Sequence, residues 1–201
     1  MTNRITTRFN ELEAYGRPGF VAYMMAGDGD SQALLNALPD AGADVIELGM
    51  PFTDPMADGA SIQASALRAL DAGMTLKGVF DQAAEFREHD TDTPLVLMGY
   101  ANPVHHMGFE NFARQAEKAG VDGLICVDIP PEEDAELRAA LEAHGIALIR
   151  LATPTTDDKR LETVVENTSG FVYYVSTTGV TGAASGVAQE VGAAVSRVKA
   201  A

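Results

Sequence analysis

The sequence predicts an α/β fold in which strand–helix units repeat around a parallel sheet. Three observations support this. Short apolar runs alternate with segments of helical periodicity along all 201 residues. Several helical segments end at a glycine just before the next apolar run, at Gly42, Gly120 and Gly145, where glycine can adopt the left-handed conformation of a helix end. The apolar runs are nearly continuous, which is typical of parallel strands covered on both faces.

The pattern divides the chain into six strand–helix units. The expected strands are Phe20–Met25, Val45–Leu48, Leu95–Tyr100, Gly123–Val127, Ala147–Leu151 and Phe171–Val175. The expected helices include Ser31–Ala41, Thr75–His89, Phe109–Ala119, Pro131–His144, Lys159–Asn167 and Ala188–Lys199. With 46% hydrophobic residues the chain can bury one core, so we expect a single domain over residues 1–201.

Two architectures fit this pattern, an open doubly wound sheet and a barrel. Four polar or aromatic residues, Glu47, Tyr100, Asp128 and Tyr173, fall at or near the carboxyl ends of different strands. Active sites of eight-stranded barrels gather at that end, which favours the barrel. Barrels of eight units typically need about 250 residues. Because we count only six units, we expect the chain to stop after its sixth unit.

Composition excludes several classes of function. The net charge of −15 comes from 29 acids and 14 bases, which makes nucleic acid an unlikely partner. The acids are spread along the chain and lysines are few, which suggests a solvated surface suited to a salt-rich cytoplasm. No apolar run reaches the roughly 18 residues of a membrane span, and the amino terminus lacks an apolar signal core, so a cytoplasmic protein is expected.

Metal or thiol chemistry is not expected. Cys126 is the single cysteine and lies in an apolar run, so a buried inert thiol is favoured over a nucleophile. The adjacent His105 and His106 have no cysteine or acid cluster at ligand spacing near them, so metal binding is not favoured.

Two carboxylates flank the end of the second expected strand. Alternation places Glu47 on the same face as Val45, so its side chain points where a core residue is expected. Asp58 follows in a loop that two prolines stiffen, which suits a carboxylate held over a substrate. Spacing alone leaves a helix cap or a solvated loop anchor open as alternatives, but two carboxylates at one mouth suggest proton transfer.

Residues 47 to 59 read Glu-Leu-Gly-Met-Pro-Phe-Thr-Asp-Pro-Met-Ala-Asp-Gly, and Ser61-Ile62-Gln63 follow after Ala60. This string closely resembles the signature of the tryptophan synthase alpha subunit. The resemblance continues through four further segments, 20–28, 100–103, 128–130 and 173–182. One departure is Gly29, where the family commonly has proline. The resemblance implies a parallel (βα) barrel of the TIM type, with about six of its eight units present and the carboxyl-terminal part missing.

The activity that the resemblance implies is cleavage of indole-3-glycerol phosphate to indole and glyceraldehyde 3-phosphate. This carbon–carbon lyase step of tryptophan biosynthesis needs no cofactor, and the family partner is the beta subunit. Glu47 is expected to move protons between the indole ring carbon and the side-chain hydroxyl. Asp58 is expected to stabilise positive charge on the indole nitrogen.

The resemblance also implies a set of substrate-binding residues: Phe20, Tyr100, Ile125, Asp128, Tyr173, Thr181 and Gly182. Phe20, Tyr100 and Ile125 are expected as apolar walls for the indole. Without the resemblance, Tyr173 is equally a core residue and Asp128 equally a helix cap. Gly182 would supply one amide to the phosphate, and Thr181 would help position Asp58.

Two other interpretations remain open. The first is an inactive barrel fragment that keeps the beta-subunit docking surface or that is made for folding studies, because further phosphate-binding amides are expected from the seventh and eighth units. Another phosphate-handling barrel, such as a sugar-phosphate isomerase, is the second. The string from Glu47 to Asp58 counts against it.

Overall fold

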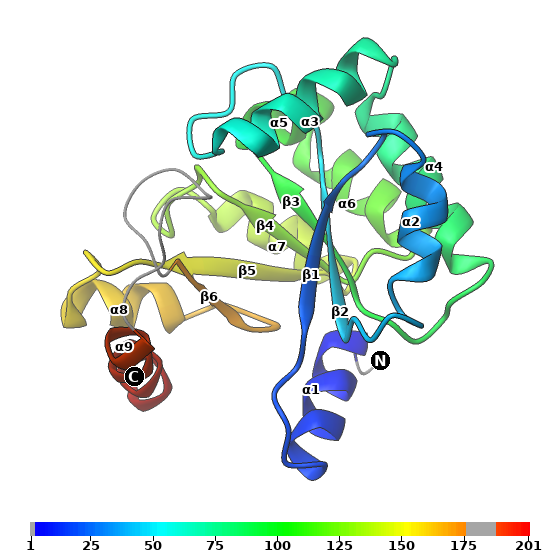
Figure 1. Ribbon diagram of the computed structural model, residues 1–201. Coiled ribbons are helices and arrows are strands. Elements are labelled where there is room, and N and C mark those ends of the chain that lie inside the picture. Colours follow the sequence, from blue (N-terminus) through cyan, green and yellow to red (C-terminus); the bar gives the residue numbers. More distant parts are fainter. Residues whose placement is uncertain (1–2, 176–187) are drawn as a thin grey trace.

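The computed structural model describes residues 3–175 and 188–201, and a six-stranded parallel sheet that curls like the wall of a barrel forms its centre (Figure 1). The strands are β1 (Val21–Met25), β2 (Val45–Gly49), β3 (Leu95–Gly99), β4 (Gly123–Cys126), β5 (Ala147–Ala152) and β6 (Val172–Tyr174). They pair in chain order, and each pair is parallel. The predicted α/β class and all six predicted strands are confirmed, with ends that differ by at most one residue.

Helices connect the strands and cover the outer face of the sheet. Their bounds are α1 (Arg4–Ala14), α2 (Ser31–Ala37), α3 (Ala60–Asp71), α4 (Leu76–Arg87), α5 (Ala101–Met107), α6 (Phe109–Lys118), α7 (Ala135–Ala143), α8 (Asp158–Val165) and α9 (Ala188–Ala200). The helices predicted from the sequence did not include α1, α3 and α5. In α5, Pro103 lies in the first turn, where backbone N–H groups have no partner within the helix, so proline does not break it.

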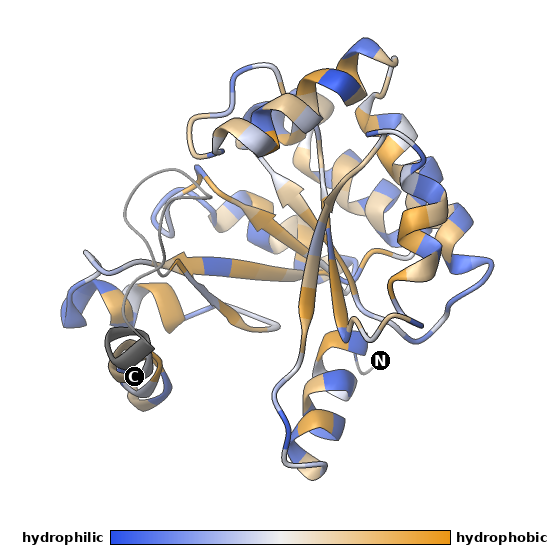
Figure 2. Ribbon diagram, viewed as in Figure 1, coloured by the Kyte–Doolittle hydropathy of each residue, from blue (hydrophilic) through white to orange (hydrophobic). Residues whose placement is uncertain are grey.

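The two faces of the sheet have different partners, as the alternation predicted. Ile46 and Leu48 of β2 pack outward against the helices. Val45 faces the inside of the curl, in a second cluster with Val96, Ile125 and Ile149. Apolar residues mark both the strands and the inward sides of the helices (Figure 2). Glu47 therefore shares its inward face with core residues.

Helix α1 closes the end of the sheet where the strands begin (Figure 1). Its Ile5 is wholly buried within the inner cluster, and the Phe9 ring lies 5.6 Å from that of Phe171. The Asn3 side chain caps the helix by accepting the N–H of Ile5 at 2.8 Å, which replaces a bond that the first turn lacks. Helix α1 thus covers the amino ends of the strands and not their carboxyl ends.

Buried acids tie the strands together at the same amino ends. Asp44 accepts the N–H of Phe20 at 2.8 Å, and Asp122 accepts the N–H of Leu95 at 2.9 Å. Arginine partners neutralise both acids, among them Arg87, whose Nη2 lies 2.7 Å from Asp122. Because a buried carboxylate is costly unless it is paired and hydrogen-bonded, these acids are structural and lie far from the carboxyl-end mouth.

The turn after β1 contains Gly29, where the family commonly has proline. Gly29 adopts φ +61°, a conformation that proline cannot reach because its ring holds φ near −65°.

Among the described residues, β1 and β6 each pair with a strand on one side only. No helix in the described ranges is long and apolar enough to cross a membrane.

Candidate active site

A cavity of about 130 Å³ opens at the carboxyl ends of the strands, on the inner face of the sheet. Its lining residues are Tyr23, Met25, Glu47, Met50, Asp58, Ile62, Met98, Gly99, Tyr100, Val127 and Tyr173. The structure thus brings four of the expected site residues to one cavity: Glu47, Asp58, Tyr100 and Tyr173. They come from β2, the loop after it, the end of β3 and β6.

Glu47 is a buried carboxyl group that has no salt bridge within residues 3–175 and 188–201. The residue is only 3% exposed, and its Oε1 atom has no hydrogen-bond partner among the described residues. Burial raises the pKa of Glu47 to about 7, because a desolvated carboxylate is less stable than the neutral acid. A carboxyl group with this pKa can both give and take a proton near neutral pH.

Asp58 stands in the loop between β2 and α3, beside the amino end of the helix. It is half-buried, and burial raises its pKa, while the Tyr100 hydroxyl partly offsets this by stabilising the charged form. The two carboxyl groups therefore have different surroundings, one apolar and one with a donor. Such a difference in surroundings can separate the proton affinities of two carboxyl groups.

Tyr100 connects the end of β3 to the loop that carries Asp58. Its hydroxyl accepts the N–H of Ala57 at 3.1 Å, and its ring lies 5.5 Å from that of Phe52. Burial and nearby acids raise the pKa of Tyr100 to about 12, so the phenol stays neutral at physiological pH. It is both a wall of the cavity and a support for the loop.

The remaining expected residues lie elsewhere. Phe20 precedes β1 at the amino end of the sheet, is 59% exposed and does not line the cavity. Ile125 is wholly buried in the inner cluster, below the cavity rather than in its wall. The expectation that these two residues form apolar walls for the indole stays a prediction. Thr181 and Gly182 lie outside the described residues, and their roles stay predictions.

Asp128 acts as a helix cap in this structure, the less specific of its two expected roles. Its carboxylate accepts the N–H of Ala101, the first residue of α5, at 2.7 Å. The negative charge thereby meets the amino end of a helix, where it is favoured. The helix it caps is a neighbour, not the next helix along the chain, which the sequence could not show. The Cys126 thiol lies 3.7 Å from the same oxygen.

The Cys126 side chain is buried, as expected. Burial and the nearby Asp128 charge raise the pKa of the Cys126 thiol to about 12, so it stays protonated and unreactive near neutral pH. No group of three His, Cys, Asp or Glu side chains that could hold a metal ion occurs within residues 3–175 and 188–201.

Tyr23 is the principal site residue that the sequence analysis missed. It lines the cavity and is the register partner of Glu47 on the neighbouring parallel strand. Register partners in a parallel pair face the same side, so alternation with Glu47 as the reference identifies Tyr23 rather than Phe20. Met98 and Val127 line the cavity from the inner faces of neighbouring strands by the same rule.

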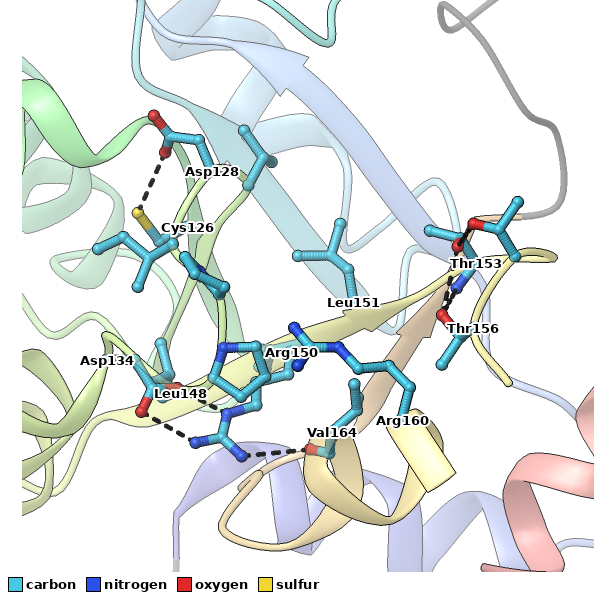
Figure 3. A pocket seen from close by; sticks show the side chains of 16 residues that line it. Cys126, Asp128, Asp134, Leu148, Arg150, Leu151, Thr153, Thr156, Arg160 and Val164 are labelled. Carbon is cyan, nitrogen blue, oxygen red and sulfur yellow. Dashed lines mark hydrogen bonds and ion pairs between the residues drawn. The ribbon is translucent and has the colours of Figure 1, made fainter. Parts of the chain in front are cut away.

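A second, larger cavity of about 420 Å³ lies between the β4 and β5 ends and α8 (Figure 3). Asp128 lines it, but Glu47 and Asp58 do not. Arg150 donates to both Asp134 carboxylate oxygens at 2.7 and 2.9 Å and to the Val164 carbonyl at 3.3 Å. This buried pair joins β5 to the loop before α7 and to α8.

The other polar groups of this second cavity also bond to protein. The hydroxyl of Thr153 lies 2.9 Å from that of Thr155 and 3.2 Å from that of Thr156 (Figure 3). Arg160 pairs with Glu132 across the loops. Since the polar groups already have partners, this cavity does not demand a ligand, and the smaller cavity with its unpartnered carboxyl oxygen is the stronger candidate.

Comparisons with known proteins agree with one another. The sequence model of a family described as tryptophan synthase alpha chain matches residues 9–201. A curated relative with that description, from Caulobacter sp. (strain K31), is 61% identical over 200 residues, covering 98% of this chain and 73% of the relative. Its greater length agrees with the expectation of a shorter chain.

Solved structures show the same fold. The tryptophan synthase alpha chain from Legionella pneumophila subsp. pneumophila superposes with a TM-score of 0.89 at 36% identity, covering 100% of this chain and 74% of that one. A chain of the tryptophan synthase a2b2 complex from Pyrococcus furiosus gives a TM-score of 0.81 at 42% identity, covering 90% and 74%. The curled sheet is therefore the wall of a TIM-type barrel, and the doubly wound alternative is excluded.

Proposed function

This chain belongs to the tryptophan synthase alpha chain family, and from that membership we propose that it cleaves indole-3-glycerol phosphate to indole and glyceraldehyde 3-phosphate. The family assigns it a lyase activity in tryptophan biosynthesis. The observation that carries the proposal for this chain is a pair of carboxyl groups on one cavity, Glu47 and Asp58. They lie at the carboxyl ends of barrel strands, the usual place for catalytic groups in this fold.

Glu47 is the proton carrier in this proposal. Protonation of the indole ring carbon that bears the side chain turns the ring into a cation. The carbon–carbon bond then breaks, its electrons return to the ring, and the side-chain hydroxyl loses its proton as the aldehyde forms. A single group that first gives and then takes a proton needs a pKa near the working pH, and Glu47, with a pKa of about 7, meets that need.

Asp58 is the electrostatic partner. The positive charge of the protonated ring is shared by the indole nitrogen, so a carboxylate near its N–H stabilises the transition state more than the substrate. Asp58 is less buried than Glu47 and has the Tyr100 hydroxyl beside it. The rings of Tyr23, Tyr100 and Tyr173 supply flat apolar walls to the same cavity.

A beta chain is the proposed partner. The Pyrococcus furiosus relative was solved within an a2b2 complex. In this chain, the loop between β2 and α3 carries Met56, a large apolar residue that is 77% exposed. Such a residue at the mouth of the barrel fits an interface that receives the indole product.

The test is direct product analysis. Purified chain is incubated with indole-3-glycerol phosphate, alone and with a tryptophan synthase beta chain. Indole is measured by chromatography and glyceraldehyde 3-phosphate by a coupled dehydrogenase assay. We expect equal amounts of the two products. A folded chain that binds the substrate but forms neither product, with or without the beta chain, would refute catalysis and favour a purely binding role.

A further inference from the structure

Tyr23 and Glu47 are direct neighbours across the first strand pair. The register of β1 and β2 sets Tyr23 opposite Glu47, and both side chains line the cavity on the inner face. Register partners on adjacent parallel strands are about 5 Å apart. The phenol and the carboxyl group are therefore held side by side by the backbone itself, independently of the loops.

Gly49 makes room for the phenol. Gly49 lies two residues beyond Glu47 on the same strand and face, and a Cβ atom added there would come within 2.9 Å of Tyr23 Cζ and closer still to the hydroxyl oxygen. A distance below 3.0 Å is not tolerated between such atoms. The glycine thus lets the Tyr23 ring lean over β2, so that its hydroxyl stands on the same face as the Glu47 carboxyl group.

The cavity is lined by two carboxyl groups and three phenols, and only one of the two carboxyl groups has a phenol hydroxyl as a partner. Asp58 has the Tyr100 hydroxyl, whereas Glu47 Oε1 has no partner among the described residues. Besides burial, the charges of Asp58 and Glu47 raise the pKa of Tyr23, and the charge of Glu47 raises the pKa of Tyr173. A buried carboxylate that lacks a donor is strongly disfavoured.

We propose that the Tyr23 hydroxyl is a positioning group for Glu47. When Glu47 is ionised, the hydroxyl turns about its C–O bond and donates a hydrogen bond to the carboxylate, as Tyr100 does for Asp58. When Glu47 is neutral, the bond is not needed and the carboxyl group can turn to the substrate. The inference rests on the proposed function, because it assigns Tyr23 a role in the proton cycle of Glu47.

The hydroxyl has a defined effect on the chemistry. A donor to the charged form lowers the pKa of a carboxylic acid. In this proposal, Tyr23 therefore limits the rise that burial produces in the Glu47 pKa. Of the other groups on the cavity, Asp58 is an acid whose charge acts in the opposite direction, and Tyr173 is the competing donor.

The experiment is a carboxyl titration that needs no turnover. The chain is labelled with glutamate carrying carbon-13 in the side-chain carboxyl group, and the Glu47 signal is assigned with Glu47→Gln. Wild type is compared with Tyr23→Phe, which keeps the ring, with Tyr173→Phe on the same cavity, and with Tyr15→Phe on the surface, where Tyr15 is 79% exposed. Dispersed amide spectra confirm that each variant is folded.

We expect Tyr23→Phe to raise the Glu47 pKa by about one pH unit, and Tyr173→Phe and Tyr15→Phe to leave it unchanged. An unchanged Glu47 pKa in Tyr23→Phe would overturn the inference, and so would a shift confined to Asp58 or one produced by Tyr173→Phe instead. The product assay separates this outcome from the proposed function. A chain that releases indole with an unshifted pKa refutes only the Tyr23 role, and a shifted pKa without indole refutes only the reaction.

Discussion

The Tyr100 hydroxyl accepts the backbone N–H of Ala57 at 3.1 Å, so the end of β3 holds the loop that brings Asp58 to the cavity. The position of Asp58 thus depends on a residue 42 places further along the chain, at the end of the next strand. Tyr100 also stabilises the charged form of Asp58. One side chain therefore supports the loop and partly offsets the rise that burial produces in the Asp58 pKa.

Removal of this hydroxyl predicts a loosened loop. Tyr100→Phe keeps the ring but leaves the Ala57 N–H without its acceptor. A hydrogen bond of this kind contributes about 0.5–1.5 kcal/mol, so hydrogen exchange at Ala57 should quicken by about tenfold. Amide exchange followed by NMR measures it. Tyr174→Phe, on the opposite face of β6, is the control, and equal exchange at Ala57 in both variants would show that the contact does not hold the loop.

The burial of Glu47 predicts a pH dependence of stability. Its pKa is about 7 in the fold and 4.5 when exposed. Between these values the folded chain keeps a proton that the unfolded chain releases, so stability falls as pH rises through this window. The wild type should lose up to about 3 kcal/mol relative to Glu47→Gln.

Urea unfolding of both proteins at pH 4.5, 6 and 8 measures this difference. The two free energies of unfolding should be most alike at the lowest pH, and the variant should gain relative to wild type as pH increases. Parallel profiles would mean that Glu47 titrates normally and is not desolvated in solution.

The acidic surface predicts stabilisation by salt. With a net charge of −15, repulsion between surface acids destabilises the compact chain, and its reach shrinks from about 10 Å at 0.1 M salt to about 3 Å at 1 M. Exposed pairs such as Lys77 with Asp81 lose little, because they contribute little. The melting temperature should rise with potassium chloride over this range. A constant or falling melting temperature would remove the proposal of a salt-rich habitat.

The outer edge of β1 predicts self-association. In the described part of the chain β1 pairs only with β2, and three apolar residues at this edge are exposed, Phe20, Val21 and Tyr23. An open apolar edge attracts other strands, and a lysine placed on it prevents this. We therefore expect the wild-type chain to associate as its concentration rises, and Val21→Lys to associate less. Sedimentation velocity measures both.

Leu34→Lys is the matched control for that substitution, since Leu34 is 51% exposed on α2 and away from the edge. It should leave association unchanged. A wild-type chain that stays monomeric at every concentration would show that the edge is protected.

The strands were predictable because both faces of a parallel sheet are buried, which makes runs such as Val45–Leu48 stand out from their surroundings. Helices α1 and α5 were not. In α1 only two of eleven residues are buried, so its apolar pattern is weak and its Asn3 cap is the better signal. In α5, Pro103 argues against a helix, and the sequence pattern alone does not show that this proline lies in the first turn.

Site residues were predictable from the sequence where the alternation within a single strand was sufficient to place them. Alternation within β2 was enough to direct Glu47 inward. Tyr23 was missed because its place on the cavity depends on how β1 pairs with β2, and the register puts Tyr23 opposite Glu47. The Asp128 bond to Ala101 likewise joins two segments 27 residues apart in the chain, and neither segment alone reveals it.

The most direct test of the central proposal is the rate of indole release by Glu47→Gln and Asp58→Asn, each compared with wild type and with Glu133→Gln, an exposed acid on the loop before α7. The measurement is made in a background that turns over indole-3-glycerol phosphate, if necessary with the chain extended to the full length of its relatives. Each site variant should remain folded and lose on the order of a hundredfold or more in turnover, while Glu133→Gln keeps the wild-type rate. Near-normal indole release by either site variant would contradict the assignment of these two carboxyl groups.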